Sequence, residues 1–159
     1  MFLTIEDFIH CIFFFPRLIL PHPTEINIEQ ITQNIIQLSK SGEALGVFIE
    51  PVGQKTGAII SKEVLKKIVD VTKKCNVPLI FNETASKFYA YDKSCFYASN
   101  DDITPDAIMA YHGGQLGTVN ISSNYFLDKP LMLISTWDGD EFSANMTLDE
   151  VIYVEENKN

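Results

Sequence analysis

The sequence predicts an α/β domain in which helices pack on a mostly parallel sheet. Three short apolar segments, at residues 45–49, 78–81 and 107–111, have the length and composition of strands buried on both faces. The first two are separated by a segment with helical periodicity, and two parallel strands joined by a helix form a right-handed βαβ unit. We expect the third segment to extend the same sheet.

Length and composition indicate one globular domain. The chain has 159 residues, of which 46% are hydrophobic and 21% are charged, as in ordinary soluble domains. A domain of this size buries roughly 70% of the surface that its unfolded chain exposes, so it can form one core. We predict a single domain over residues 1–154, followed by a frayed tail at residues 155–159.

Charge and hydropathy argue against two kinds of partner. The chain has 12 Lys and Arg residues against 21 Asp and Glu residues, and the net charge of −9 would repel a phosphate backbone. The only long apolar run, residues 8–20, is broken by His10, Pro16 and Arg17. It is too short to span a membrane and has the wrong flanks for a signal peptide. We therefore expect no nucleic acid and no membrane as a partner, and we predict a buried strand or an interface segment for this run.

The cysteines indicate a reducing compartment. Cys11, Cys75 and Cys95 are odd in number and widely spaced, with no CxxC pair and no partnered histidine cluster. A disulfide scaffold or a zinc site is therefore not expected, and we predict no metal site. The expected location is cytoplasmic, with targeting to an organelle left open.

Two segments have the periodicity of amphipathic helices. The first begins at Asn27, which has capping-box spacing to Gln30, and it ends at Gly42. The second begins at Ser61, a favourable N-cap residue, and is stopped by residues 76–78. In each segment, apolar residues three or four apart share one side of the helix. They are Ile28, Ile31, Ile35 and Leu38 in the first, and Val64, Ile68, Val71 and Cys75 in the second.

Polar residues and glycines follow the three predicted strands. Glu50 follows the first strand, Asn82 and Glu83 follow the second, and His-Gly-Gly at residues 112–114 follows the third. In open α/β sheets, ligands bind just outside the carboxyl ends of the strands. The sequence therefore predicts the candidate site at these three strand ends.

Other motifs favour an ordinary structural interpretation over a functional one. Residues 112–114 are predicted to form a tight turn and not a phosphate loop, because no Walker lysine or Gly-x-Gly-x-x-Gly pattern surrounds them. His112 has no nearby partner in the sequence for catalysis or metal binding. Asp138, Asp140 and Glu141 lack the spacing of a calcium loop and are predicted to form a solvated turn. Core or interface packing is predicted for the aromatic residues Tyr89, Tyr91, Phe96 and Tyr97.

Five segments, taken in order, carry a resemblance to a known family. They are Phe-Pro-Arg-Leu at residues 15–18 with Pro21, Ile-Glu-Pro-Val at 49–52, Leu-Ile-Phe-Asn-Glu at 79–83, Pro-Asp-Ala-Ile at 105–108 and Ser-Thr-Trp-Asp-Gly-Asp at 135–140. Together they resemble the large domain of class III (fold-type I) pyridoxal-phosphate aminotransferases, closest to 4-aminobutyrate aminotransferase and lysine 6-aminotransferase. The resemblance implies part of the large domain of the PLP-dependent transferases, with pyridoxal phosphate (PLP) as the cofactor and a homodimer as the assembly.

The resemblance also implies roles for individual residues. It places Asn82 and Glu83 at the cofactor, and Thr136 against the cofactor phosphate of the neighbouring subunit. It gives Glu50 a part in ordering the substrate site. An ordinary polar loop residue at Thr136 and an ordinary strand-end acid at Glu50 fit the sequence equally well.

Residues that the family's chemistry needs are replaced in this chain. The imine-forming lysine of the family corresponds to Gly113 or Gly114, so no catalytic residue is assigned. Lys87 lies in the segment after the second strand, and we expect no lysine close enough to replace the missing one. Asn82 stands where the family has an aspartate against the pyridine nitrogen, and a neutral amide cannot supply that charge. Ala85 replaces the glutamine that contacts the 3-hydroxyl group of the cofactor, and the loop at residues 53–57 is only loosely like that of the family.

The resemblance and these replacements lead to one functional expectation with two alternatives. Family members are longer, and their phosphate-cradling loop and small C-terminal domain have no counterpart in this sequence. We expect a truncated class III aminotransferase-like protein without independent transaminase activity. The alternatives are a subunit of a split PLP-dependent aminotransferase completed by another chain, and an α/β binding or interaction module. Because strands of the larger sheet would be missing, we expect a homo-oligomer or a partner chain to cover the exposed sheet edges.

Overall fold

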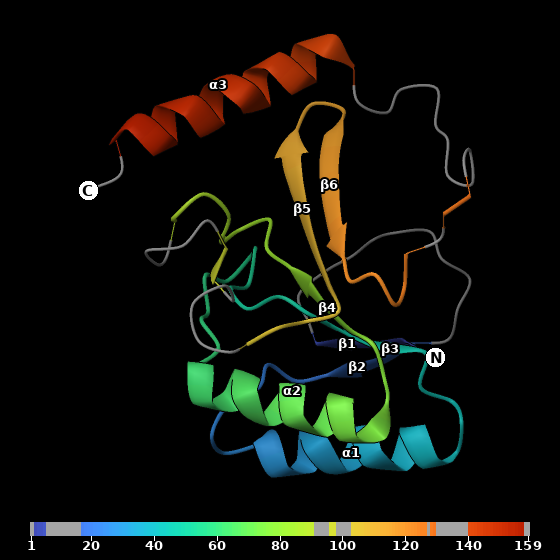
Figure 1. Cartoon of the computed structure of the whole chain (residues 1–159). Coiled ribbons are helices and arrows are strands. Elements are labelled where there is room, and N and C mark those ends of the chain that lie inside the picture. The colour runs from blue at the N-terminus through green and yellow to red at the C-terminus, as the bar shows by residue number, and fades with distance from the viewer. Residues whose placement is uncertain are drawn as a thin grey trace.

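A six-stranded sheet forms the centre of the molecule (Figure 1). The computed structural model describes residues 2–5, 17–90, 96–97, 103–126, 128–129 and 140–157. The strand order is β2-β1-β3-β4-β5-β6, in which β1 to β5 run parallel to one another and β6 is antiparallel to β5. The predicted α/β class with a mostly parallel sheet is therefore confirmed. The strands are β1 (Phe2–Ile5), β2 (Arg17–Leu20), β3 (Gly46–Ile49), β4 (Leu79–Asn82), β5 (Ala107–Gly113) and β6 (Leu116–Ile121).

The predicted βαβ unit consists of β3, the helix α2 (Lys62–Cys75) and β4. β3 and β4 pair in parallel, with Val47 opposite Leu79. β5 extends the sheet beside β4, as predicted, but its last residues are not buried, and Tyr111 is 50% exposed. This end of β5 leaves the body of the sheet as one arm of a hairpin (Figure 1).

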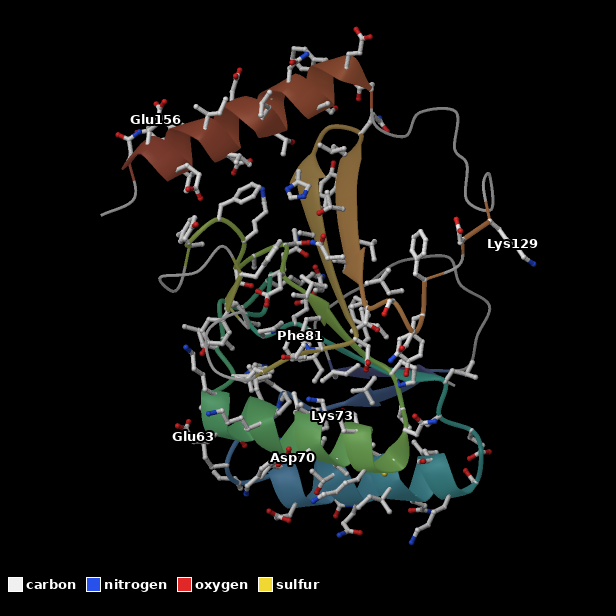
Figure 2. The ribbon with its side chains drawn as sticks, in the orientation of Figure 1. Glu63, Asp70, Lys73, Phe81, Lys129 and Glu156 are labelled. Atoms are coloured by element: carbon white, nitrogen blue, oxygen red, sulfur yellow. The ribbon has the colours of Figure 1, made fainter. Side chains whose placement is uncertain are left out.

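The core lies between the sheet and two helices. The helix α1 (Ile28–Lys40) and α2 lie side by side on one face of the sheet (Figure 1). Their predicted apolar sides face inward, and burying each such side chain contributes roughly 1.5–3 kcal/mol. Figure 2 shows Phe81 of β4 in the interior. The fully buried side chains include Ile28, Ile31 and Ile35 of α1, Leu65 and Ile68 of α2, and Ile49, Leu79 and Phe81 of the sheet.

The two helices differ in how they begin. Ser61 caps α2 as predicted, since its hydroxyl accepts a hydrogen bond from the Val64 amide at 3.4 Å. The predicted capping box at the start of α1 is wrong. The Asn27 side chain instead accepts a hydrogen bond from the Thr24 amide at 2.7 Å and donates one to the His22 carbonyl at 2.8 Å. Asn27 therefore stabilises the turn before α1, and its side chain makes no bond to the helix.

The β5–β6 hairpin was not predicted from the sequence. β6 pairs along the whole of β5, from Ala107 opposite Ile121 to Gly113 opposite Leu116. Gly113 and Gly114 have φ values of +100° and +56°, a region of backbone conformation that favours glycine. The turn predicted for residues 112–114 is thus confirmed, and it is the turn of a hairpin.

A third helix, α3 (Glu141–Asn157), lies across the tip of this hairpin (Figure 1). Asp140 caps it, because its Oδ1 atom accepts hydrogen bonds from the amides of Phe142 and Ser143, both at 3.0 Å. The solvated turn predicted for Asp140 and Glu141 is therefore wrong: a carboxylate that accepts amide hydrogen bonds starts a helix there. The helix includes residues 155–157 of the predicted tail. None of the helices that the structure describes is long and apolar enough to cross a membrane.

Candidate functional site

The polar residues that follow β3 and β4 meet at the carboxyl edge of the sheet. Glu50 and Asn82 are each 5% exposed, and Asn82 Nδ2 donates a hydrogen bond to Glu50 Oε1 at 3.0 Å. The parallel register of β3 and β4 places these side chains together, as predicted for adjacent strand ends. The bond joins the two strands through a buried carboxylate and a buried amide.

The side-chain oxygen of Asn82 also has hydrogen-bond partners. Asn82 Oδ1 accepts hydrogen bonds from the Thr84 amide at 3.1 Å and from the Thr84 hydroxyl at 2.6 Å. The Thr84 hydroxyl in turn accepts one from the Tyr111 amide of β5 at 3.0 Å. The Asn82 side chain is thus held from both ends, and through Thr84 it links β3, β4 and β5.

Glu50 also orders the loop that follows it. Its Oε2 atom accepts a hydrogen bond from the Gln54 amide at 3.0 Å. Its two carboxylate oxygens are therefore engaged by separate donors, Asn82 and Gln54. A buried carboxylate is stable only with such partners, so Glu50 has a structural role in joining β3, β4 and the loop after β3.

Glu83 is 0% exposed, and the bonds of its side chain are separate from those of Asn82. Its Oε2 atom accepts hydrogen bonds from the Ser86 hydroxyl and, at 3.1 Å, from the Tyr97 amide. Tyr97 is itself buried and donates its hydroxyl to the Ile60 carbonyl at 3.2 Å. The core position predicted for Tyr97 is confirmed, and Glu83 holds that residue in place.

The hairpin turn contains Gly113 and Gly114, the two positions at which the resemblance implies a lysine. A Cβ atom added to Gly114 would lie 2.2 Å from Ser143 Oγ and 3.1 Å from Ser143 Cβ, whereas one added to Gly113 would meet nothing within 4 Å. Ser143 Oγ accepts a hydrogen bond from the Gln115 amide at 2.9 Å and donates one to Asp140 Oδ2 at 2.6 Å. The first turn of α3 therefore occupies the space beside Gly114.

His112 lies among side chains from three elements. Its Nε2 atom is 2.8 Å from the Thr118 hydroxyl across the hairpin, and its ring stacks on Phe88 with the ring centroids 5.3 Å apart. Its Nδ1 atom is buried without a hydrogen-bond partner. Burial of the ring and the nearby Lys87 ammonium group lower the pKa of His112 below its usual value, while Glu150 acts in the opposite direction.

Lys87 is closer to the hairpin than its place in the sequence suggests. Its Nζ atom lies 4.4 Å from the centroid of the Phe88 ring, and Phe88 is the residue that stacks on His112. The same Nζ atom forms an ion pair with Glu150 of α3 at 3.3 Å. Lys87 thus lies near His112 of the hairpin, with its amine held by Glu150 and Phe88. That no lysine replaces the missing one stays a prediction.

The residues at these strand ends do not fit the cofactor that the resemblance implies. In the described part of the chain, the hairpin offers no amine at residues 113 and 114, and Asn82 is a neutral amide held by Glu50 and Thr84. Ala85, in place of a glutamine, packs against the core. Thr136 lies outside the described residues, so its predicted contact to a cofactor phosphate stays a prediction.

Two further observations limit the chemistry of the described residues. They contain no group of three or more His, Cys, Asp or Glu side chains that could hold a metal ion. Cys75 is a free, half-buried thiol at the end of α2. Cys11, Cys95 and Tyr91 lie outside the described ranges.

The residues that the sequence analysis missed all act through hydrogen bonds. Thr84 and Ser86 hold Asn82 and Glu83, and Ser143 holds the hairpin turn. Only the last had a signal in the sequence. Asp140 and Ser143 are three apart at the start of a segment rich in helix formers, which is the spacing of an N-cap and the N3 residue.

Comparisons with known proteins identify the fold. No family model matches the chain, and no curated protein matches it in sequence. The acetylornithine aminotransferase from Elizabethkingia anophelis is similar in structure, with 20% sequence identity and a TM-score of 0.76, over 99% of this chain and 42% of that one. The ornithine aminotransferase from Plasmodium yoelii has 18% identity and a TM-score of 0.73, over 99% of this chain and 39% of that one.

The same fold occurs in other transaminases. A transaminase from the marine bacterium Virgibacillus has 20% identity and a TM-score of 0.72, over 89% of this chain and 35% of that one. The ornithine aminotransferase from Toxoplasma gondii, whose active site is partially occupied by PLP, has 16% identity and a TM-score of 0.75, over 99% of this chain and 41% of that one. The chain thus has the fold of part of the class III aminotransferases, as the resemblance implies, and it spans well under half the length of these enzymes.

Proposed function

We propose that this chain is a class III aminotransferase-like protein of the 4-aminobutyrate and lysine 6-aminotransferase subgroup, without transaminase activity of its own. The observation that supports the proposal is the β5–β6 turn, which has Gly113 and Gly114 where the resemblance implies a lysine. In a PLP-dependent transaminase, a lysine amine holds the cofactor and moves the substrate proton. A chain without that amine lacks both functions.

The structure around the turn supports the proposal. Ser143 fills the space beside Gly114, so a lysine at residue 114 would displace the first turn of α3. At the end of β4, the Asn82 amide is neutral and is bonded to Glu50 and Thr84. A neutral amide cannot stabilise a protonated pyridine ring as a carboxylate does.

Among the described residues, Lys87 is the lysine whose contacts place it near the hairpin. To attack an aldehyde, its Nζ atom would first have to leave both the Glu150 carboxylate and the Phe88 ring. An amine in an ion pair also has no free electron pair with which to attack. We therefore do not assign it the role of the imine-forming residue.

The test is to mix the purified chain with PLP and to record the visible absorbance of an imine. Borohydride reduction and mass mapping then locate any trapped lysine. We expect no imine at a defined lysine and no half-reaction with 4-aminobutyrate or lysine. An imine at Lys87 that disappears in Lys87→Arg and persists in the matched surface variant Lys66→Arg would contradict the proposal, if half-turnover accompanies it.

A second measurement separates the split-enzyme alternative. The chain is mixed with a candidate partner polypeptide that carries its own lysine, and the half-reaction is repeated. Activity that requires both chains would replace the proposed inactive protein with a subunit of a two-chain enzyme.

A further inference from the structure

The outer side of α3 is more apolar than the side that faces the molecule. The residues turned toward the hairpin are Ser143, which is buried, and the half-buried Thr147, Val151 and Val154. They are three or four apart and so share one side of the helix. α1 and α2, by contrast, turn their isoleucines, leucines and valines inward. When the largest apolar residues of a helix face outward, that outer side is a candidate contact surface for another molecule.

The outward residues form two apolar strips. Phe142, Met146 and Tyr153, at spacings of four and seven, lie on one side and are 74%, 56% and 68% exposed. Leu148 and Ile152, four apart, lie on the other side and are 54% and 45% exposed. We call these five residues the outer strips of α3. Single exposed apolar residues are ordinary on protein surfaces, but five on one helix, in two strips, are more than a scattered set and are typical of an interaction surface.

The charge of α3 has one sign. The helix contains five acidic residues and no Lys or Arg. Asp149 and Glu156, seven apart, lie between the two outer strips. Figure 2 shows Glu156 on α3, at the opposite end of the molecule from Lys73 of α2. The acidic residues are Glu141, Asp149, Glu150, Glu155 and Glu156.

This pattern disfavours a second copy of the chain that would contact α3 through its own α3 or α2. Two α3 helices packed against each other would bring acidic residues together, and like charges across an interface are costly. The lysine-rich helix α2 of a second copy would match in charge. However, none of the exposed large hydrophobic residues in the described part of the chain lies on α2, so it could not cover the outer strips.

We propose that the outer side of α3 is a docking surface for a different protein, whose contact surface is apolar and flanked by lysine or arginine. The outer strips supply the apolar contact, and Asp149 and Glu156 select for the basic flanks. The inner side of the helix is already fixed, because Ser143 holds the hairpin turn, Glu150 holds Lys87 and Glu155 accepts the Tyr89 hydroxyl at 2.7 Å. The surface is therefore preorganised. The proposal goes beyond the loss of transaminase activity and does not depend on it.

The test uses the full chain and two synthetic helical peptides as probes. One has a leucine stripe flanked by lysines, and its twin has glutamates in place of the lysines. Binding is measured by fluorescence anisotropy. We expect the lysine peptide to bind about fivefold more tightly than its twin, and the preference to shrink as salt screens the charges. A photo-crosslinker in the lysine peptide should attach to residues of α3.

Substitutions in α3 test whether the peptides bind at its outer side. The triple variant Phe142→Ser, Met146→Ser and Tyr153→Ser should weaken binding of both peptides, and Asp149→Lys with Glu156→Lys should reverse the preference between them. The matched controls are Ile26→Ser, at an apolar residue that is 95% exposed before α1, and Glu63→Lys on α2; both should bind like the wild type.

Three outcomes would overturn the proposal. Equal binding of the two peptides would show that the surface does not select for basic flanks. Crosslinks outside α3 would show that the peptide binds elsewhere. A concentration-dependent dimer in sedimentation experiments that the triple variant dissociates would make a second copy the occupant. Circular dichroism of each variant checks that the fold is intact, so that a loss of binding reports on the surface.

Discussion

Asn82 shows what can and cannot be predicted for a single residue. The sequence alone predicts that an amide replaces a carboxylate and removes a charge. It does not predict the bonds to Glu50 and Thr84, because they depend on the register of β3 against β4 and on the turn that follows β4. The residue that the resemblance assigns to a cofactor ring is, in this chain, a buried cross-link between strands.

Restoring the carboxylate at this position is expected to destabilise the protein. In Asn82→Asp, two buried carboxylates would face each other in place of the bond that now spans 3.0 Å. We expect a loss of about 2 kcal/mol in the free energy of unfolding at pH 7, because a buried hydrogen bond is replaced by like-charge repulsion. Urea unfolding of the variant and the wild type measures the difference.

The destabilisation caused by Asn82→Asp is expected to change with pH in one direction. The like charge raises the pKa of the carboxylate pair in the folded state, so the unfolded chain releases these protons at lower pH. The destabilisation of Asn82→Asp should therefore be small near pH 4 and should grow as the pH rises. Asn120→Asp, at an exposed position of β6, is the control and should show no such trend. A constant difference across pH would contradict the proposed contact.

The two glycines of the hairpin turn are predicted to differ. Both have positive φ values, so an alanine at either position is strained by about 1 kcal/mol or more. Only at Gly114 does the added Cβ atom also meet Ser143. We expect Gly114→Ala to cost about 1 kcal/mol more than Gly113→Ala and to speed amide hydrogen exchange in the first turn of α3. Equal effects of the two substitutions on α3 would show that Ser143 does not fill this space.

At the scale of elements, the helices and strands with a strong apolar pattern were predicted, and those without one were missed. α1, α2 and β3 to β5 follow from one-sided or continuous apolar patterns. β6 has the sequence Leu-Gly-Thr-Val-Asn-Ile, which contains little to indicate a strand apart from its place after a turn. α3 was missed because its apolar residues lie on several sides, so the usual stripe is absent. The same irregularity makes α3 the candidate docking surface.

The contact between the hairpin, α3 and the segment after β4 is expected to weaken in acid. The pKa of His112 is lowered in the folded state, chiefly by burial and then by Lys87. The unfolded chain therefore binds this proton at a higher pH than the folded chain does, and stability is lost as the pH falls through about 6.5. We expect the stability of the wild type to fall relative to His112→Gln between about pH 7.5 and pH 5.5.

A second variant tests the cause of this effect. Lys87→Gln removes the ammonium group and leaves the opposing Glu150, so the pKa of His112 should rise and the loss of stability in acid should shrink. Direct NMR titration of the His112 ring in both proteins provides the measurement. A His112 pKa that is the same in both would exclude the assigned role of Lys87.

At the scale of the whole molecule, the central strands of the sheet are buried and the edge strand β6 is exposed. The strands β3 and β4 lie at the centre of the strand order, and their residues are mostly buried, with α1 and α2 on one face of the sheet (Figure 1). β6 is an edge strand in which Val119 is 64% exposed. The sequence could not predict this difference, because it arises from which strand comes last in the sheet.

Hydrogen exchange should follow this coverage. We expect the amides of β3 and β4, such as those of Val47 and Phe81, to exchange slowest and near the limit set by global unfolding. The amides of β6 that bond to β5 should exchange faster, because β6 is an edge strand whose residues are mostly exposed. Addition of the lysine peptide should slow exchange in α3 and not in α1. Equal protection of β3 and β6 without a partner would contradict the expected difference.

The bond between Asn82 and Glu50 also bears on how such a chain changes over generations. Restoring the aspartate alone places two carboxylates together, and restoring a lysine at residue 114 alone displaces Ser143. Each of these two single substitutions toward the residues that the resemblance implies is therefore expected to lower stability. Substitutions at Glu50 and Ser143 that remove these two contacts would reduce the loss, so the order in which such changes occur determines how stable each intermediate sequence is.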